Sequence, residues 1–273
     1  MKTSLATSPT VAQFSPLLFA GDLPKALERA AALGYNGVEL NLRDSTEIDQ
    51  DRVLDWARKH NLGLPSIGTG QSYFSDRLSL ADLSSYVQGK AQERLRDHIL
   101  FAARAGALVV LGSIRGQLEN SSPAARRAGH DAAVDSTRAL AAFAAEHGVR
   151  LVVEPINRYE TNFLNTVHEA LEFLEAVGAE NVGLLVDTFH MNIEEASMTL
   201  PVLAAGERLW HVHLVDSNRR AVGMGHLDFR PILVALREIG FTGYLSAEIL
   251  PLPDDEGAAE TWMQGIRGLC AQA

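Results

Sequence analysis

The chain has 273 residues, of which 47% are hydrophobic and 21% charged, a composition typical of globular proteins. Its formal net charge of −10 argues against a nucleic-acid partner, because phosphate binding needs clustered Lys and Arg. No apolar run approaches the ~20 residues of a membrane span, and no segment has the pattern of a signal peptide. The single cysteine, Cys270, excludes an internal disulfide and is expected to be an inert small hydrophobe. We therefore expect a cytoplasmic protein without a membrane partner.

One pattern recurs along the chain: a helix rich in Ala and Leu ends at a glycine, and an apolar strand follows within a few residues. The helix-ending glycines are Gly34, Gly106, Gly148, Gly178 and Gly240, at positions where helices favour a left-handed residue. Helices that alternate with buried strands predict a parallel sheet.

Eight strands are expected, at 2–7, 37–42, 63–68, 108–113, 150–155, 182–188, 209–215 and 243–249. Eight such units predict an α/β protein with a single (β/α)8 TIM barrel domain over residues 1–273. The longest irregular stretch, 68–90, is expected to form a loop over the barrel mouth.

Four predicted strands end in an acidic residue or a histidine: Glu154, Asp187, His213 and Glu248. Their separations of 33, 26 and 35 residues each correspond to about one strand-plus-helix unit. Because parallel barrel strands end at the same face, the four side chains should converge. Three carboxylates and an imidazole at one point repel one another unless a cation lies among them. The pattern therefore predicts a site for one divalent metal ion.

The residue types also indicate which metal and which chemistry to expect. An oxygen-rich set with one imidazole favours Mn²⁺, with Mg²⁺ or Co²⁺ as alternatives. Glu154 and Glu248 follow the fifth and eighth strands, so their carboxylates can stand on opposite sides of one bound carbon. That arrangement suits deprotonation and reprotonation at a stereocentre. Side-chain alternation places His211 one layer below His213, where we expect a hydrogen-bonded core histidine.

Several long motifs resemble those of the xylose-isomerase-like TIM barrels, in the branch of D-tagatose/D-psicose 3-epimerases and nearest to 5-keto-L-gluconate epimerases. The motifs lie at 67–73, 154–166, 187–195, 211–229 and 246–253. The resemblance implies that the four strand-end residues bind the metal and that both glutamates exchange protons with the substrate. It also implies that the substrate is bound by Glu160, His190 and Arg219.

These substrate contacts are physically reasonable. Glu160 and His190 follow ligand strands and can hydrogen-bond hydroxyl groups, while Arg219 supplies a fixed cation for a substrate oxygen. Gln71 and Arg115 follow the third and fourth strands and are further candidates for substrate contacts, although structural roles are equally open. Arg115 is also the candidate partner for a carboxylate on the substrate.

The expected activity is epimerisation next to a ketone, through an enediolate held at the metal. The resemblance implies that the substrate is 5-keto-L-gluconate or a free ketose such as D-tagatose. The lack of a glycine-rich phosphate loop agrees with a substrate that carries no phosphate. A ketose–aldose isomerase of the hydroxypyruvate isomerase type would use the same ligands. A remote alternative is an endonuclease IV-like repair enzyme, which shares the Asp-x-x-His element but has extra histidines after the third and fourth strands. The resemblance further implies a homodimer or homotetramer.

Overall fold

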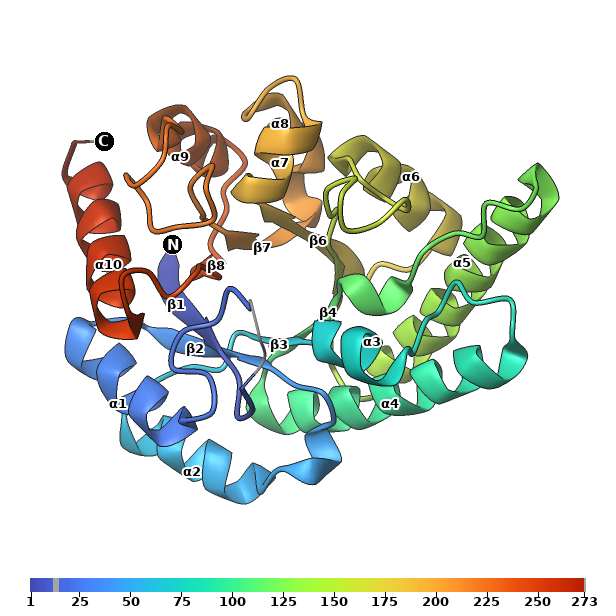
Figure 1. Cartoon of the computed structure of the whole chain (residues 1–273), viewed down its shortest axis with the longest axis horizontal. Helices are drawn as coiled ribbons and strands as arrows, with labels where there is room; N and C mark the ends of the chain where they lie inside the picture. The colour runs from blue at the N-terminus through green and yellow to red at the C-terminus, as the bar shows by residue number, and fades with distance from the viewer. Residues whose placement is uncertain (12–14, 273) are drawn as a thin grey trace.

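The computed structural model describes residues 1–11 and 15–272, and side chains within these ranges up to residue 269; the expectation for the Cys270 side chain lies outside them. Eight parallel strands form a closed barrel in chain order, with β8 paired to β1 (Figure 1). The strands are β1 (Lys2–Thr7), β2 (Gly37–Asn41), β3 (Ser66–Gly68), β4 (Leu108–Leu111), β5 (Leu151–Val153), β6 (Val182–Asp187), β7 (Leu209–His213) and β8 (Tyr244–Ala247). The predicted TIM barrel is confirmed.

Helices surround the barrel and connect its strands (Figure 1). They are α1 (Leu23–Leu33), α2 (Gln50–Lys59), α3 (Gly70–Asp76), α4 (Ser85–Ala105), α5 (Pro123–Glu146), α6 (Val167–Val177), α7 (Thr188–Glu194), α8 (Leu200–Ala205), α9 (Phe229–Glu238) and α10 (Asp255–Gln272). Short 3₁₀ helices are η1 (Ser45–Glu47), η2 (Ser113–Arg115) and η3 (Gly206–Arg208). Within the described ranges, no helix is both long and apolar enough to cross a membrane.

The helix ends follow from local sequence. Helix α6 begins with a capping box, in which Thr166 and Glu169 each accept a backbone N–H of the first turn. It ends at Gly178, whose φ of 68° lies in the left-handed region that glycine adopts without strain. Gly34 ends α1 in the same way, with φ 83°. The predicted helix ends at these glycines are confirmed.

One expectation for the barrel mouth is wrong. The stretch 68–90 is not one irregular loop, because it contains α3 and the start of α4. Helix α3 is anchored by side-chain bonds from its first turns: Thr69 Oγ1 donates to Val110 O (2.6 Å) and Ser72 Oγ donates to Arg43 O (2.7 Å). A helix this short has too few turns for an apolar periodicity to reveal it, and its tertiary contacts stabilise it instead.

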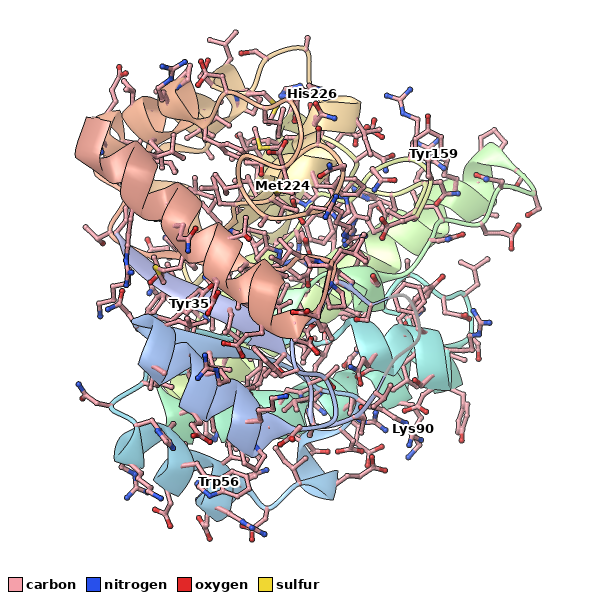
Figure 2. The ribbon with its side chains drawn as sticks, turned by 60° about the vertical axis from the view of Figure 1, so that its left-hand side comes forward. Tyr35, Trp56, Lys90, Tyr159, Met224 and His226 are labelled. Carbon is pink, nitrogen blue, oxygen red and sulfur yellow. The ribbon has the colours of Figure 1, made fainter. Side chains whose placement is uncertain are left out.

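The seam between β8 and β1 is covered by α10. Trp262 is fully buried, donates from Nε1 to Leu214 O (2.7 Å), and stacks on Tyr35 at 5.6 Å between ring centroids. Tyr35 is labelled in Figure 2. The Tyr35 hydroxyl donates to Ala259 O (2.8 Å). Helix α10 is therefore tied both to the chain that leaves β7 and to the end of α1, which fixes the last strand and the segment that follows it.

Candidate metal centre and active site

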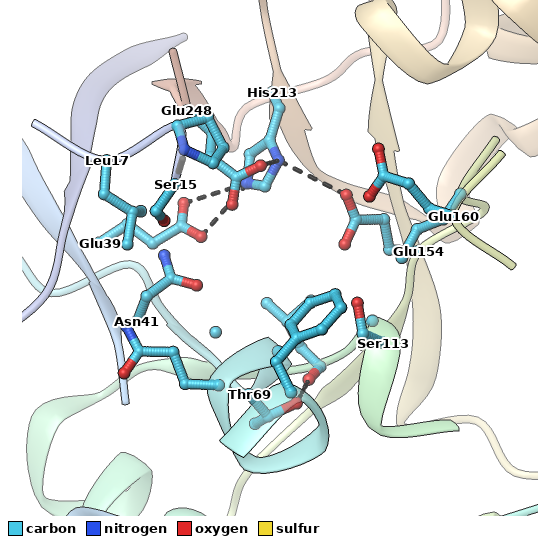
Figure 3. A pocket seen from close by; sticks show the side chains of 18 of the residues that line it. Ser15, Leu17, Glu39, Asn41, Thr69, Ser113, Glu154, Glu160, His213 and Glu248 are labelled. Atoms are coloured by element: carbon cyan, nitrogen blue, oxygen red, sulfur yellow. Dashed lines mark hydrogen bonds and ion pairs between the residues drawn. The ribbon is translucent and has the colours of Figure 1, made fainter. Parts of the chain in front are cut away.

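The structure brings Glu154, Asp187, His213 and Glu248 together at the carboxyl ends of four consecutive strands. One ligand atom from each side chain lies within 4.8 Å of the others. His213 Nδ1 is 3.7 Å from Glu154 Oε1, 3.7 Å from Asp187 Oδ2 and 3.6 Å from Glu248 Oε2. Figure 3 shows Glu154 and Glu248 reaching into the cavity from two sides, with His213 between them. The convergence expected from the strand spacing is thus present.

Local backbone structure explains how these side chains reach one point. The register pairs Asp187 with His213, so β6 and β7 end at the same height. Asp187 also caps α7, and its Oδ1 accepts the Phe189 N–H at 2.7 Å, which leaves Oδ2 turned toward the cluster. Gly112 makes room for Glu154, because a Cβ at this position would lie only 2.8 Å from Glu154 Oε2.

The cluster has the electrostatic character of a cation site. Burial, and then neighbouring carboxylates, raise the pKa of Glu154 to about 8, and burial raises the pKa of Glu248 to about 7. Burial alone would lower the pKa of His213, but Glu39, Glu248 and Asp187 raise it well above its usual value. The surrounding carboxylates therefore favour a positive charge at His213 Nδ1.

Two buried atoms of the cluster, Asp187 Oδ2 and His213 Nδ1, have no hydrogen-bond partner. Leaving such atoms unpaired costs free energy, and both lie beside the two glutamate oxygens. An ion bound between them would satisfy both atoms and neutralise the carboxylates. The four residues thus fit a single divalent ion with hard, mainly oxygen ligands.

Glu39 of β2 is a functional residue that the sequence reasoning missed. Its buried carboxylate accepts from His213 Nε2 (3.2 Å to each oxygen) and from His211 Nε2 (2.9 Å). With Nε2 protonated and bound to Glu39, a neutral His213 presents Nδ1 as its lone-pair donor to the cluster. His211 is a buried, hydrogen-bonded histidine, as expected. The available signal was a carboxylate inside the buried strand GVELN (37–41).

Three predicted substrate-binding residues lie beside the cluster. His190 Nε2 is 3.9 Å from Glu154 Oε1 and 3.9 Å from Asp187 Oδ2. Burial lowers the pKa of His190 to about 4, so its ring is neutral. Arg219 contacts Glu160 (Nη1 to Oε1, 3.1 Å) and Glu248 (Nη2 to Oε2, 3.5 Å). These side chains therefore line one continuous cavity together with Glu154, His213 and Glu248 of the proposed metal site.

Asn157 organises this side of the cavity and was also missed. Its Nδ2 group lies 2.7 Å from His190 Nδ1 and 2.9 Å from Glu160 Oε1. With His190 neutral and Nδ1 accepting from Asn157, the Nε2–H group points toward the cluster as a donor. This role could not be predicted from the sequence, since a single Asn after a strand is a common loop residue.

Gln71 lines the cavity, but its amide is already occupied. Its Nε2 donates to Ser8 Oγ (2.8 Å), and its Oε1 accepts from Thr10 Oγ1 (3.1 Å). The side chain therefore joins α3 to the loop that follows β1. Its expected contact with substrate stays a prediction.

The expectation that Arg115 faces the pocket is corrected by the structure. Arg115 is buried, is not among the residues that line the cavity, and donates to the carbonyls of Gly112 (2.9 Å), Phe163 (2.9 and 3.0 Å) and Leu164 (3.1 Å). The turn of η2 directs the guanidinium under the loop that follows β5. Arg115 thus connects two active-site loops and does not reach the cavity in which a substrate carboxylate would lie.

The cavity above the cluster has a volume of about 690 Å³, within the range of small-molecule sites. Its remaining walls come from Ser15, Pro16 and Leu17 after β1, from Asn41, and from Phe74 of α3 and Ser113 of η2. The mixture of polar and apolar walls suits a small polyhydroxylated molecule.

Residues 27–271 match the family of xylose isomerase-like TIM barrels, and the chain belongs to this family. It is 36% identical over 224 residues to the L-ribulose 3-epimerase of a Methylomonas species, covering 82% of this chain and 77% of that protein. It is 31% identical over 227 residues to the D-psicose 3-epimerase of Agrobacterium fabrum, covering 81% and 77%. The structure of a Methylomonas D-allulose 3-epimerase in complex with D-allulose has a TM-score of 0.80 and 28% identity, with 98% of each chain covered.

These comparisons place the chain among carbohydrate epimerases, which are isomerase-class enzymes. They agree with the resemblance to the ketose 3-epimerase branch. The particular closeness to 5-keto-L-gluconate epimerases is not among these findings. The epimerase relatives also favour this class over the endonuclease alternative.

The bond from Glu39 to His213 predicts an effect on metal binding. Glu39→Gln keeps the shape of the side chain but removes the charge that makes the His213 imidazole a stronger donor. We expect Mn²⁺ affinity to fall about 10- to 100-fold, measured by calorimetry on metal-free protein. Glu28→Gln, at an exposed position on α1, is the control and should bind like the parent. Equal affinity in the Glu39→Gln and control proteins would contradict this role.

The raised pKa values predict a pH dependence of metal binding. With a pKa of about 8 for Glu154 and about 7 for Glu248, the metal-free site holds protons at neutral pH. An incoming ion must displace them, so Mn²⁺ affinity should rise as the pH increases from about 6 to about 9, with proton release on binding. Calorimetry in buffers of different ionisation enthalpy measures this release. Affinity that is constant across the range would argue against the assignment.

Proposed function

We propose that this chain is a divalent-metal-dependent ketose 3-epimerase that inverts the carbon next to the ketone of a free ketose. The observation that carries this proposal is the placement of Glu154 and Glu248 on two sides of one cavity, with His213 between them. Two carboxylates that face one bound carbon from opposite sides can remove a proton on one face and return one on the other. Mn²⁺ is the proposed ion, with Mg²⁺ or Co²⁺ as alternatives.

The chain's own residues have distinct parts in this scheme. One glutamate takes the proton from the carbon, and the negative charge moves onto the substrate oxygens as an enediolate. Arg219 supplies a fixed positive charge, and the His190 Nε2–H group supplies a donor for these oxygens. A divalent ion held by the four ligands would polarise the carbonyl and stabilise the developing charge. The second glutamate then returns a proton to the opposite face.

The charges around the cavity favour an uncharged ketose over a keto acid. Among the described lining residues, the arginines are Arg43 and Arg219. Arg43 pairs with Asp76 (2.9 Å) and lies near Glu47 (3.6 Å), while Arg219 contacts Glu160 and Glu248. The side chain of Arg115 is buried elsewhere. A terminal carboxylate, as in 5-keto-L-gluconate, would therefore meet no uncommitted arginine. The L-ribulose and D-psicose epimerases among the relatives support the same choice.

A substrate panel tests the proposal. Metal-free protein is loaded with Mn²⁺ and given L-ribulose, D-psicose, D-tagatose and 5-keto-L-gluconate, and the products are identified by NMR. We expect inversion at C3 of a neutral ketose. An aldose product would indicate the isomerase alternative, and a strong preference for 5-keto-L-gluconate would overturn the substrate assignment. Assembly into a homodimer or homotetramer is a further part of the proposal.

The two-base scheme predicts the effect of replacing either glutamate. Glu154→Gln or Glu248→Gln should lower turnover roughly 10²–10⁴-fold through the lost acid/base group. In D₂O, a variant with only one base should still exchange the substrate proton with solvent, although it no longer inverts the carbon. Because both residues are also metal ligands, bound Mn²⁺ is quantified in each variant, and Glu256→Gln, at the ion pair with Arg29, is the control. A metal-loaded Glu248→Gln enzyme that epimerises at the parent rate would exclude the scheme.

A further inference from the structure

Arg219 has an unusual backbone conformation for a residue of its type. Its φ of 59° lies in the left-handed region, which costs a residue with a Cβ roughly 1–2 kcal/mol. Such conformations persist only where surrounding interactions fix them, and they gather at functional sites. Arg219 lies in the connection from β7 to α9, between residues 214 and 228. The interactions that hold this connection therefore determine where the Arg219 guanidinium lies.

The carboxylate of Asp216 is the centre of this connection. Asp216 is fully buried, and its Oδ1 accepts the N–H groups of Ser217 (2.7 Å) and Leu227 (3.2 Å). Its Oδ2 accepts the N–H of Gly223 at 2.9 Å. Gly225 packs directly against this carboxylate, because a Cβ at Gly225 would collide with Oδ1. The Asp216 carboxylate thus binds backbone N–H groups at both ends and in the middle of the 216–227 loop.

This arrangement satisfies a buried charge by backbone donors alone. Burial would raise the pKa of Asp216, but the N–H donors hold it below its usual value, so the carboxylate is ionised at neutral pH. Charge-assisted bonds of this kind are stronger than neutral ones. Asp216 does not line the cavity, and the side-chain hydrogen bonds of its carboxylate go to Ser217, Gly223 and Leu227 and to none of the four proposed metal ligands.

Backbone hydrogen bonds connect Asp216 to Arg219. The Arg219 N–H donates to Asp216 O (2.8 Å), and the Asp216 N–H donates to Arg220 O (3.1 Å), which closes a tight turn. The Leu250 N–H donates to Arg219 O (2.8 Å) and joins this turn to the chain just past Glu248. The turn that holds Arg219 is therefore fixed on one side by Asp216 and on the other by the segment after β8.

In this conformation the Arg219 guanidinium contacts three side chains. It contacts Glu160 and Glu248 and lies over the ring of Phe189, 4.9 Å from its centroid. The outer part of the loop, with Met224 and His226, lies in the upper half of Figure 2 with Tyr159, the neighbour of Glu160. A shift of the loop would move the Arg219 guanidinium away from these partners.

We propose that Asp216 is a positioning residue for Arg219: its buried carboxylate fixes the 216–227 loop in the one arrangement that places the guanidinium beside Glu160 and Glu248. The inference rests on the proposed function, in which Arg219 contacts the substrate. A cation held in place before the substrate arrives requires no reorganisation during the reaction.

Asp216→Asn tests the inference with a change of almost no volume. The substitution removes the charge and turns an NH₂ group toward backbone N–H donors. We expect kcat/KM to fall roughly 10²-fold, as for a small misplacement of a catalytic group. Mn²⁺ affinity should stay at the parent value, because no ligand has moved. Asp228→Asn makes the same change at the exposed cap of α9 and should leave kcat/KM unchanged.

A double-mutant cycle separates positioning from a general structural role. If Asp216 acts through Arg219, then Asp216→Asn adds no further loss of kcat/KM to Arg219→Ala. Losses that add fully, or parent kcat/KM in Asp216→Asn, would overturn the proposal. If Asp216→Asn does not fold, Gly223→Ala replaces it, since φ is 88° there and a Cβ meets no neighbour. The proposal then requires that Gly223→Ala, too, add no further loss of kcat/KM to Arg219→Ala.

Two further readouts separate this inference from the proposed function. Amide hydrogen exchange of the 216–227 segment should be faster in Asp216→Asn than in Asp228→Asn, whatever the substrate is. Unchanged exchange would refute the role of the carboxylate. If Arg219→Ala retains the parent kcat/KM, the role of Arg219 in the proposed function fails and the positioning role fails with it.

Discussion

The constraint on which the rest of the site depends is the crowding of four carboxylates, three of them buried and Glu248 partly buried, around one imidazole. Glu39, Glu154, Asp187 and Glu248 all approach His213, at distances from 3.2 to 3.7 Å. Such a group of like charges is unfavourable in a protein interior unless positive charge is present. The pKa values of Glu154, Glu248 and His213 are raised, so without a metal these side chains tend to hold protons that reduce the net negative charge. A divalent ion bound among these side chains would meet the same need with greater charge and would leave the carboxylates ionised for chemistry.

The barrel makes this concentration of charge possible. Closure of β8 onto β1 and the covering helix α10 fix the strands, so side chains at their ends cannot move apart to relieve repulsion. Beyond the four proposed metal ligands, further residues orient the side chains of the site. Glu39 hydrogen-bonds His213, Asn157 hydrogen-bonds His190, and the loop around Asp216 contains Arg219. The site is therefore built on rigid strands and on loops held by buried polar bonds.

The sequence revealed those parts of the site that depend on strand ends. Glu154, Asp187, His213 and Glu248 could be found because parallel strands share one end, and side-chain alternation also placed His211 correctly. Glu39 lies deeper in β2, and its partners on β7 are distant in sequence, so only the closed barrel brings them together. Arg115 was misplaced because its position after β4 does not determine the direction of its side chain, which the η2 turn sets. Helix α3 was missed because its stability comes from tertiary bonds.

The most direct measurement of the central claim is a Mn²⁺ titration of metal-free protein, followed by electron paramagnetic resonance and by epimerase activity. The account predicts one tightly bound Mn²⁺ per chain, activity that appears in proportion to it, and loss of both in Asp187→Ala, whose carboxylate has no role in proton transfer. Full activity without metal, or undiminished Mn²⁺ binding in Asp187→Ala, would contradict the account.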